Sequence, residues 1–142
     1  MAAQDLHAEA ITWLTDFHKH MDSLNAEVAV PKFFAEDCVL SFAENPPITG
    51  VANIKDFLSA QYQYLESMHH TIKRVDVVSD RIYQEADIRY VVKGDPERKE
   101  ILIKGIALVG KRPKQEKMNT FTVYLDPTAL KERIAAVVGG EI

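Results

Sequence analysis

The sequence predicts an α+β protein in which N-terminal helices wrap one face of a curved antiparallel sheet and form a cone with a small-molecule pocket. Apolar residues recur at helical spacing in two long segments before residue 66, whereas residues 69–125 read as four consecutive strands. Short turns between those strands make them antiparallel neighbours. Helices that are segregated from a run of strands indicate an α+β domain with its helices on one sheet face.

The first helix is predicted over about residues 6–24. Apolar residues recur there every three or four positions, which gives the helix one buried stripe: Ala10, Trp13, Leu14, Phe17, Met21 and Leu24. Residues 26–35 are also apolar but contain Pro31. Because a proline inside a helix breaks it, we expect a short second helix that begins near Pro31.

The remaining elements follow from turn and capping residues. A short strand is predicted over residues 38–42, and Asn53 is expected to cap the second long helix. The meander strands are predicted at 69–78, 81–93, 101–111 and 118–125. Asp126 and Pro127 then predict the start of a final helix that stops at Gly139.

Composition sets the class of protein. The chain has 142 residues, 46% of them hydrophobic, and a net charge of −4, so we expect one domain over residues 1–142 that does not bind nucleic acid. A single cysteine, Cys38, excludes an internal disulfide. We find no pattern of a secretory signal and no apolar stretch of membrane-spanning length, and we expect a cytoplasmic protein.

The third meander strand is largely apolar on both of its faces over residues 101–109, although it contains Lys104. An antiparallel strand with one wet face should alternate instead. A homodimer through the sheet face would cover the second side, and so would the chain's own terminal helix. We favour the dimer.

Five segments resemble the nuclear transport factor 2-like superfamily, in its SnoaL-like branch, which includes scytalone dehydratase and polyketide cyclases. The similar segments are residues 21–25, 33–40, 47–50, 54–58 and 70–75, and the resemblance extends over about residues 11–134. The resemblance implies a cystatin-like α+β barrel that binds a small hydrophobic ligand. Members of this superfamily include cofactor-independent dehydratases, isomerases and cyclases as well as plain binding modules, so the fold does not transfer an activity.

Asp22 and His70 are the candidate catalytic pair. They lie at the places where scytalone dehydratase has an aspartate that orients a histidine, and such a pair can move a proton at neutral pH. A solvated Asp22 and a hydrogen-bonded sheet residue His70 are the ordinary alternative, and His69 could take the place of His70. The expected ligand-binding residues are Trp13, Phe17, His18, Phe42, Phe57, Tyr62, Tyr90 and Asn119. We expect no metal site and no cofactor.

Other positions depart from the enzymes of the superfamily. The resemblance places Ala86 where scytalone dehydratase has a second histidine, and Phe42 where it has a tyrosine. Phenylalanine can neither donate to an oxyanion nor remove a proton. The function expected is therefore the binding of a hydrophobic, polyketide-like metabolite, with a cofactor-independent lyase or isomerase reaction if there is catalysis. The alternative is a non-catalytic dimeric binding or scaffold module with a collapsed pocket.

Overall fold

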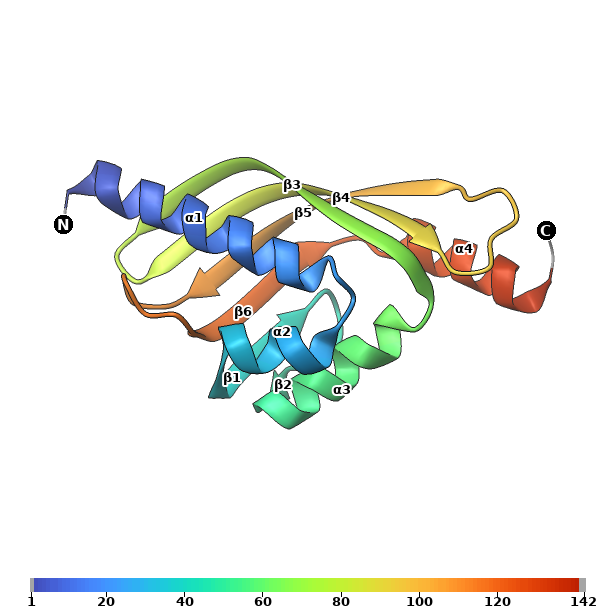
Figure 1. Cartoon of the computed structure of the whole chain (residues 1–142), viewed down its shortest axis with the longest axis horizontal. Coiled ribbons are helices and arrows are strands. Elements are labelled where there is room, and N and C mark those ends of the chain that lie inside the picture. Colours follow the sequence, from blue (N-terminus) through green and yellow to red (C-terminus); the bar gives the residue numbers. More distant parts are fainter. Residues whose placement is uncertain (1, 141–142) are drawn as a thin grey trace.

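The computed structural model describes residues 2–140, which form four helices around one curved sheet of six strands (Figure 1). The α+β class is therefore confirmed. The helices are α1 (Ala3–Met21), α2 (Ala26–Phe33), α3 (Val51–Tyr62) and α4 (Thr128–Gly139). The strands are β1 (Phe34–Phe42), β2 (Ile48–Thr49), β3 (Leu65–Val78), β4 (Arg81–Val92), β5 (Glu100–Gly110) and β6 (Met118–Leu125).

The strand order across the sheet is β2-β1-β6-β5-β4-β3. The four meander strands, β3 to β6, are antiparallel neighbours, as predicted. Strand β1 joins the other side of β6 in parallel, with Phe42 opposite Val123, so the sheet is mixed. Because β2 and β3 are its two edges, the sheet remains open and does not close into a barrel.

Helix α2 differs from its prediction. It begins at Ala26, and Pro31 lies inside it. Since Pro31 falls in the last turn of an eight-residue helix, its missing N–H group removes one intrahelical hydrogen bond near the end. Burial of one apolar side of the helix compensates for that loss. The buried residues of α2 are Ala26, Ala29, Val30 and Phe33.

The caps of α3 and α4 also differ in detail. Gly50, with a φ of 93°, precedes α3, and Asn53 lies inside the helix with its side-chain Nδ2 donating to the Thr49 carbonyl. A positive φ is readily open to glycine, which explains why the helix starts earlier than predicted. At α4 Pro127 is the N-cap and the helix begins at Thr128, one residue later than predicted, while the Asp126 carboxylate accepts the Thr128 N–H at 3.0 Å.

Two strands are longer than their predictions at the N-terminal end. Strand β1 starts at Phe34, directly after α2, and β3 starts at Leu65, three residues after α3. Both residues are buried, although Leu65 continues the three- and four-residue apolar spacing of Leu58 and Tyr62 in the preceding helix.

Helix α1 runs along the sheet beside β3 and covers its concave side (Figure 1). Its predicted stripe is buried at Ala10, Leu14, Phe17 and Met21. At its N-terminal end His7 Nε2 donates to the Val75 carbonyl of β3, at 3.1 Å. No helix within residues 2–140 is long and apolar enough to cross a membrane.

Candidate functional site

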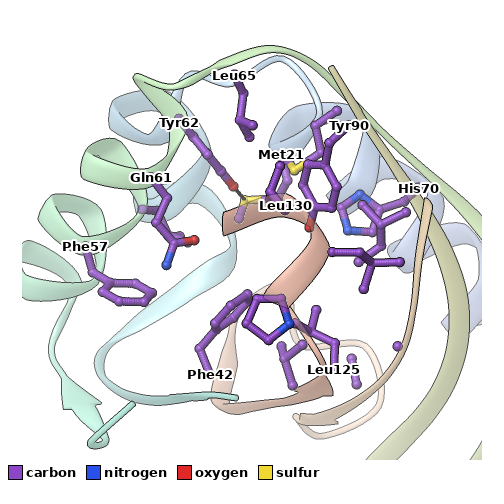
Figure 2. Close-up of a pocket in the computed structure, with 18 of the residues that line it drawn as sticks. Met21, Phe42, Phe57, Gln61, Tyr62, Leu65, His70, Tyr90, Leu125 and Leu130 are labelled. Carbon is purple, nitrogen blue, oxygen red and sulfur yellow. Dashed lines mark hydrogen bonds between the residues drawn. The ribbon is translucent and has the colours of Figure 1, made fainter. Parts of the chain in front are cut away.

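The concave side of the sheet encloses a cavity of about 530 Å³. Its walls come from α1, α3, α4 and the inner faces of β1, β3, β4, β5 and β6, and most of the lining is apolar. Figure 2 shows His70 and Tyr90 on one side of this space, with Phe57 and Gln61 of α3 on the opposite side. A cavity of this size and polarity is suited to a ring-bearing small molecule.

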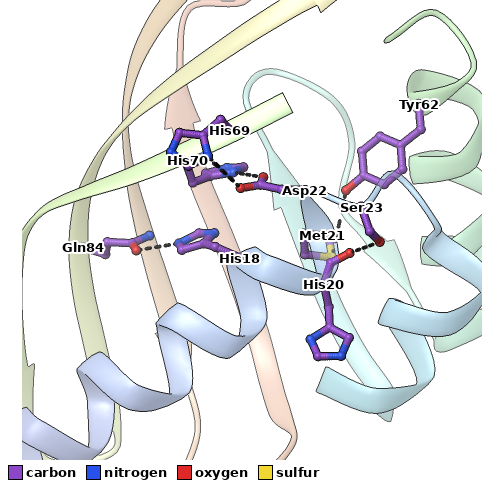
Figure 3. A network of polar contacts seen from close by, with 9 residues as sticks. All are labelled: His18, His20, Met21, Asp22, Ser23, Tyr62, His69, His70 and Gln84. Carbon is purple, nitrogen blue, oxygen red and sulfur yellow. Dashed lines mark hydrogen bonds and ion pairs between the residues drawn. The ribbon is translucent and has the colours of Figure 1, made fainter. Parts of the chain in front are cut away.

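Asp22 and His70 are in contact on the side of the cavity where His70 and Tyr90 lie. Asp22 is the C-cap of α1, and His70 lies on β3 opposite the buried Ile88 of β4. The His70 Nδ1–H donates to Asp22 Oδ1 at 2.6 Å, and the His70 backbone N–H donates to Asp22 Oδ2 at 2.9 Å (Figure 3). Both side chains are mostly buried, with 14% and 15% exposed.

This pairing fixes the orientation of the His70 ring. Because Nδ1 carries the proton that Asp22 accepts, Nε2 holds the free lone pair of the neutral imidazole. His70 lines the cavity, whereas Asp22 lies behind it. The side chain of His69 is 72% exposed, and its Nδ1 lies 3.9 Å from Asp22 Oδ2. Of the two neighbouring histidines, it is therefore His70 that lines the cavity.

His18 extends the pair into a stacked cluster. Its ring lies parallel to that of His70, with 4.3 Å between the ring centroids, and its Nε2 contacts Gln84 Oε1 at 2.6 Å. Burial, with the adjacent His70 adding to it, lowers the pKa of His18 to about 4. The His18 ring is therefore neutral at physiological pH.

Tyr62 and Tyr90 also line the cavity. Burial raises the pKa of both phenols well above the ordinary value, so they remain protonated hydrogen-bond donors. The Tyr62 hydroxyl points to Met21 Sδ, 3.9 Å away. The Tyr90 hydroxyl lies on the same side of the cavity as the His70 ring (Figure 2).

Most of the expected ligand-binding residues line the cavity, namely Phe17, His18, Phe42, Phe57, Tyr62 and Tyr90. Trp13 and Asn119 do not line it. Trp13 stacks on Phe17 from the far side, and its Nε1–H donates to the Glu116 carbonyl. Asn119 is exposed on β6. Both were chosen by residue type, and only the folded chain shows which way each side chain points.

Sequence reasoning missed Gln84 and the contribution of α4. Gln84 is 2% exposed and lies in a row of inward-facing residues on β4 that is otherwise apolar or aromatic. A polar residue at an inward position of an alternating strand was the available signal. From α4, Leu130 and Ile134 reach the cavity, although no residue of this helix is fully buried.

Two other kinds of chemistry find no support in the side chains. Within residues 2–140 no three His, Cys, Asp or Glu side chains are grouped so that they could hold a metal ion. Burial, with the neighbouring Asp37 adding to it, raises the pKa of the Cys38 thiol to about 12, so this side chain is not a thiolate nucleophile.

The α+β cone and its apolar cavity define a nuclear transport factor 2-like fold. The chain belongs to the SnoaL-like domain family, whose model matches residues 7–115. No curated protein sequence matches the chain significantly.

Solved structures share the fold at low sequence identity. PrhC from Penicillium brasilianum superposes with a TM-score of 0.76 at 10% identity, covering 96% of this chain and 91% of that one. A candidate SnoaL-like polyketide cyclase from a Jannaschia species gives 0.73 at 11%, covering 92% and 94%. A protein from Catenulispora acidiphila with a ketosteroid isomerase-like fold gives 0.67 at 20%, covering 79% and 83%. At these identities the likeness shows the fold alone.

Proposed function

We propose that the protein binds an apolar, ring-bearing metabolite in the cavity and catalyses a proton transfer on it without a cofactor. The observation that carries this proposal is the 2.6 Å bond between Asp22 and His70, which directs the second nitrogen of a cavity-lining imidazole to the ligand space. An imidazole held in one orientation is suited to accept and return a proton at neutral pH.

Each residue has a separate role in this proposal. His70 Nε2 is the general base and then the general acid. Asp22 is a positioning residue, because it holds the ring in one tautomer and stabilises the imidazolium that forms when Nε2 takes a proton. Tyr90 donates to the ligand oxygen on which negative charge develops. Dehydration, isomerisation and cyclisation all begin with such a proton abstraction next to a carbonyl. Polyketide-like rings carry such carbonyl groups, so they are suitable substrates for these three reactions.

Hydrogen–deuterium exchange at the α-carbon of ring ketones tests the proton transfer without knowledge of the natural substrate. A panel including 1-tetralone is incubated in D2O with the protein, and NMR follows loss of the α-proton signal. We expect exchange above the buffer rate in the wild type, a loss of about 10²-fold or more in His70→Asn, and a smaller loss in Asp22→Asn. His20→Asn is the matched control and should keep the wild-type rate, because His20 lies outside the cavity lining and bonds to the Asp16 carbonyl.

Equal exchange in the wild type and in His70→Asn would show that this imidazole is not the base. Ligand binding with no exchange in any protein would instead favour the alternative function, a binding module. The cavity is open in the structure, so that alternative no longer includes a collapsed pocket.

A further inference from the structure

Gln84 is a polar side chain in a buried, apolar setting. Its neighbours on the inner face of β4 are Ile82, Ala86 and Ile88, and all four side chains point to the concave side of the sheet. An amide in such a place raises the free energy of the folded state unless its oxygen and its nitrogen both find partners. The structure supplies a partner for only one of the two.

The amide oxygen is bound to His18. His18 Nδ1 is buried and has no hydrogen-bond partner among residues 2–140, so it carries a lone pair and not a proton, because buried N–H groups without an acceptor are rare in proteins. The proton of the neutral ring is then on Nε2, which donates to Gln84 Oε1 at 2.6 Å. This donation fixes the orientation of the amide and leaves its Nε2 on the other side.

The amide nitrogen remains accessible from the cavity. Within residues 2–140, the hydrogen bond to His18 is the only one that the Gln84 side chain makes. In that part of the chain, two side-chain polar atoms are both inaccessible to solvent and without a hydrogen-bond partner, namely Glu9 Oε2 and His18 Nδ1. Gln84 Nε2 is not one of them, so this nitrogen keeps some accessible surface. Gln84 lines the cavity, and the small side chain of Ala86 beside it leaves room for a ligand.

We propose that Gln84 is a specificity-determining residue whose side-chain N–H groups donate a hydrogen bond to an acceptor oxygen of the ligand. The ligand is then an oxygenated ring compound with a carbonyl or phenolic oxygen directed at β4, and a pure hydrocarbon is discriminated against. A site built to hydrogen-bond an oxygen rejects the analogue that lacks it, because its own polar group is left unpaired.

The anchor is close to the proposed base. The His18 ring is bonded to Gln84 on one side and stacked on His70 on the other, so one imidazole separates the amide from the base (Figure 3). An oxygen held by Gln84 therefore places nearby ring carbons within reach of His70. The inference rests on the proposed function only in that a ligand occupies this cavity, and it does not require the proton transfer.

The test compares a ketone with its parent hydrocarbon, 1-tetralone with tetralin, as ligands. Binding is titrated by NMR on ¹⁵N-labelled protein, and the side-chain NH₂ signal of Gln84 is assigned by its absence in Gln84→Met. We expect 1-tetralone, and not tetralin, to shift that signal. We expect Gln84→Met to bind 1-tetralone about tenfold more weakly than the wild type, as loss of one hydrogen bond would give, and to bind tetralin equally well.

Two further variants keep the result interpretable. Gln84→Glu retains an acceptor oxygen for His18 but has no N–H group, so it should also lose the preference for the ketone. Gln61→Met removes the other cavity-lining glutamine, on α3, and should keep the preference. Thermal unfolding of each variant confirms that it is folded.

Equal affinity of wild type and Gln84→Met for 1-tetralone overturns the proposal, as does an unmoved Gln84 NH₂ signal or no binding of 1-tetralone at all. The proton-exchange assay with His70→Asn separates this proposal from the proposed function, because proton exchange depends on His70 whereas the ketone preference depends on Gln84. If the protein shows no proton exchange but Gln84 still sets the ketone preference, only the catalytic proposal fails.

Discussion

Both carboxylate oxygens of Asp22 accept a hydrogen bond from the same residue, His70. One oxygen accepts the ring Nδ1–H, and the other accepts the backbone N–H of a strand that lies at the edge of the sheet. An edge strand presents N–H groups that no neighbouring strand satisfies, so this contact also stabilises the sheet. Asp22 thus has a structural reason for its position in addition to the proposed catalytic one. For this reason the exchange assay needs Asp22→Asn beside His70→Asn.

The buried His18 makes the stability of the protein depend on pH. Its pKa is about 4 in the folded protein and 6.5 in an unfolded chain, so between these values only the unfolded state binds the proton. The contribution is present in full above pH 6.5 and is lost as the pH falls towards 4. We expect His18 to account for a loss of about 3 kcal/mol in the free energy of unfolding over that window.

Urea denaturation at several pH values between 7.5 and 4.5 measures this contribution. His18→Gln removes the titrating group from the same place and should flatten the dependence, whereas His69→Asn changes an exposed histidine and should leave it steep. A dependence that is as steep in His18→Gln as in the wild type would show that another group causes it.

At the scale of elements, α4 is attached to the rest of the fold by few groups. None of its residues is fully buried, and it reaches the cavity through side chains that include Leu130 and Ile134. The strongest tie is Arg133, whose Nε and Nη2 donate to the two Asp95 oxygens at 2.8 and 2.7 Å. Asp95 lies in the β4–β5 loop and also accepts hydrogen bonds from the backbone N–H groups of Glu97 and Lys99. Its carboxylate is therefore held in place independently of Arg133.

We expect Arg133→Lys to loosen α4, because lysine cannot form the two parallel hydrogen bonds of a guanidinium. Amide hydrogen exchange over residues 128–139 should become about tenfold faster, as loss of one charged hydrogen bond would give, with little change in α1. Arg98→Lys is the matched control, since Arg98 pairs with Glu66 at an exposed site where such pairs contribute little. Unchanged exchange in α4 would mean that its apolar contacts alone hold it.

The sequence predicted those elements whose signal is local. The stripe of α1, the four meander strands and the Asp126 hydrogen bond at the start of α4 each rest on spacing or on a turn residue, and the structure has all of them. The differences come from tertiary contacts. Pro31 is accepted inside α2 because the helix is buried on one side, and Leu65 joins β3 because it pairs opposite Val92.

The residues of the candidate site can likewise be divided into those expected from the sequence and those that depend on tertiary contacts. Proximity of Asp22 and His70 was expected from a resemblance along the whole chain, and the structure has the two in contact. The partner of His18 could not be expected, because Gln84 is 66 residues away and reaches it only through the register of β3 and β4. The parallel pairing of β1 with β6 is likewise a long-range contact without a local pattern.

At the scale of the whole molecule, the outer face of the sheet carries exposed apolar side chains beside charged ones. Leu102 on β5 and Tyr124 on β6 are 46% and 61% exposed, and Lys104 follows Leu102 on the same face of β5. Helix α4 does not cover these residues' outer face, because it lies on the cavity side, where Leu130 and Ile134 line the pocket. Of the two covers expected from the sequence, a second copy of the chain is the one that remains available, and we propose a symmetric dimer through this face.

Sedimentation velocity tests the dimer. The chain has a mass of 16.0 kDa, and we expect the wild type to sediment as a species of twice that mass. Leu102→Lys places a like charge on both copies of a self-complementary face, so it should weaken the dimer by roughly tenfold or more and shift the population to monomer. Val28→Lys adds the same charge at an exposed position on α2 and should leave the dimer intact. A wild-type protein that sediments at 16.0 kDa at working concentrations would contradict the dimer and leave this face for another partner.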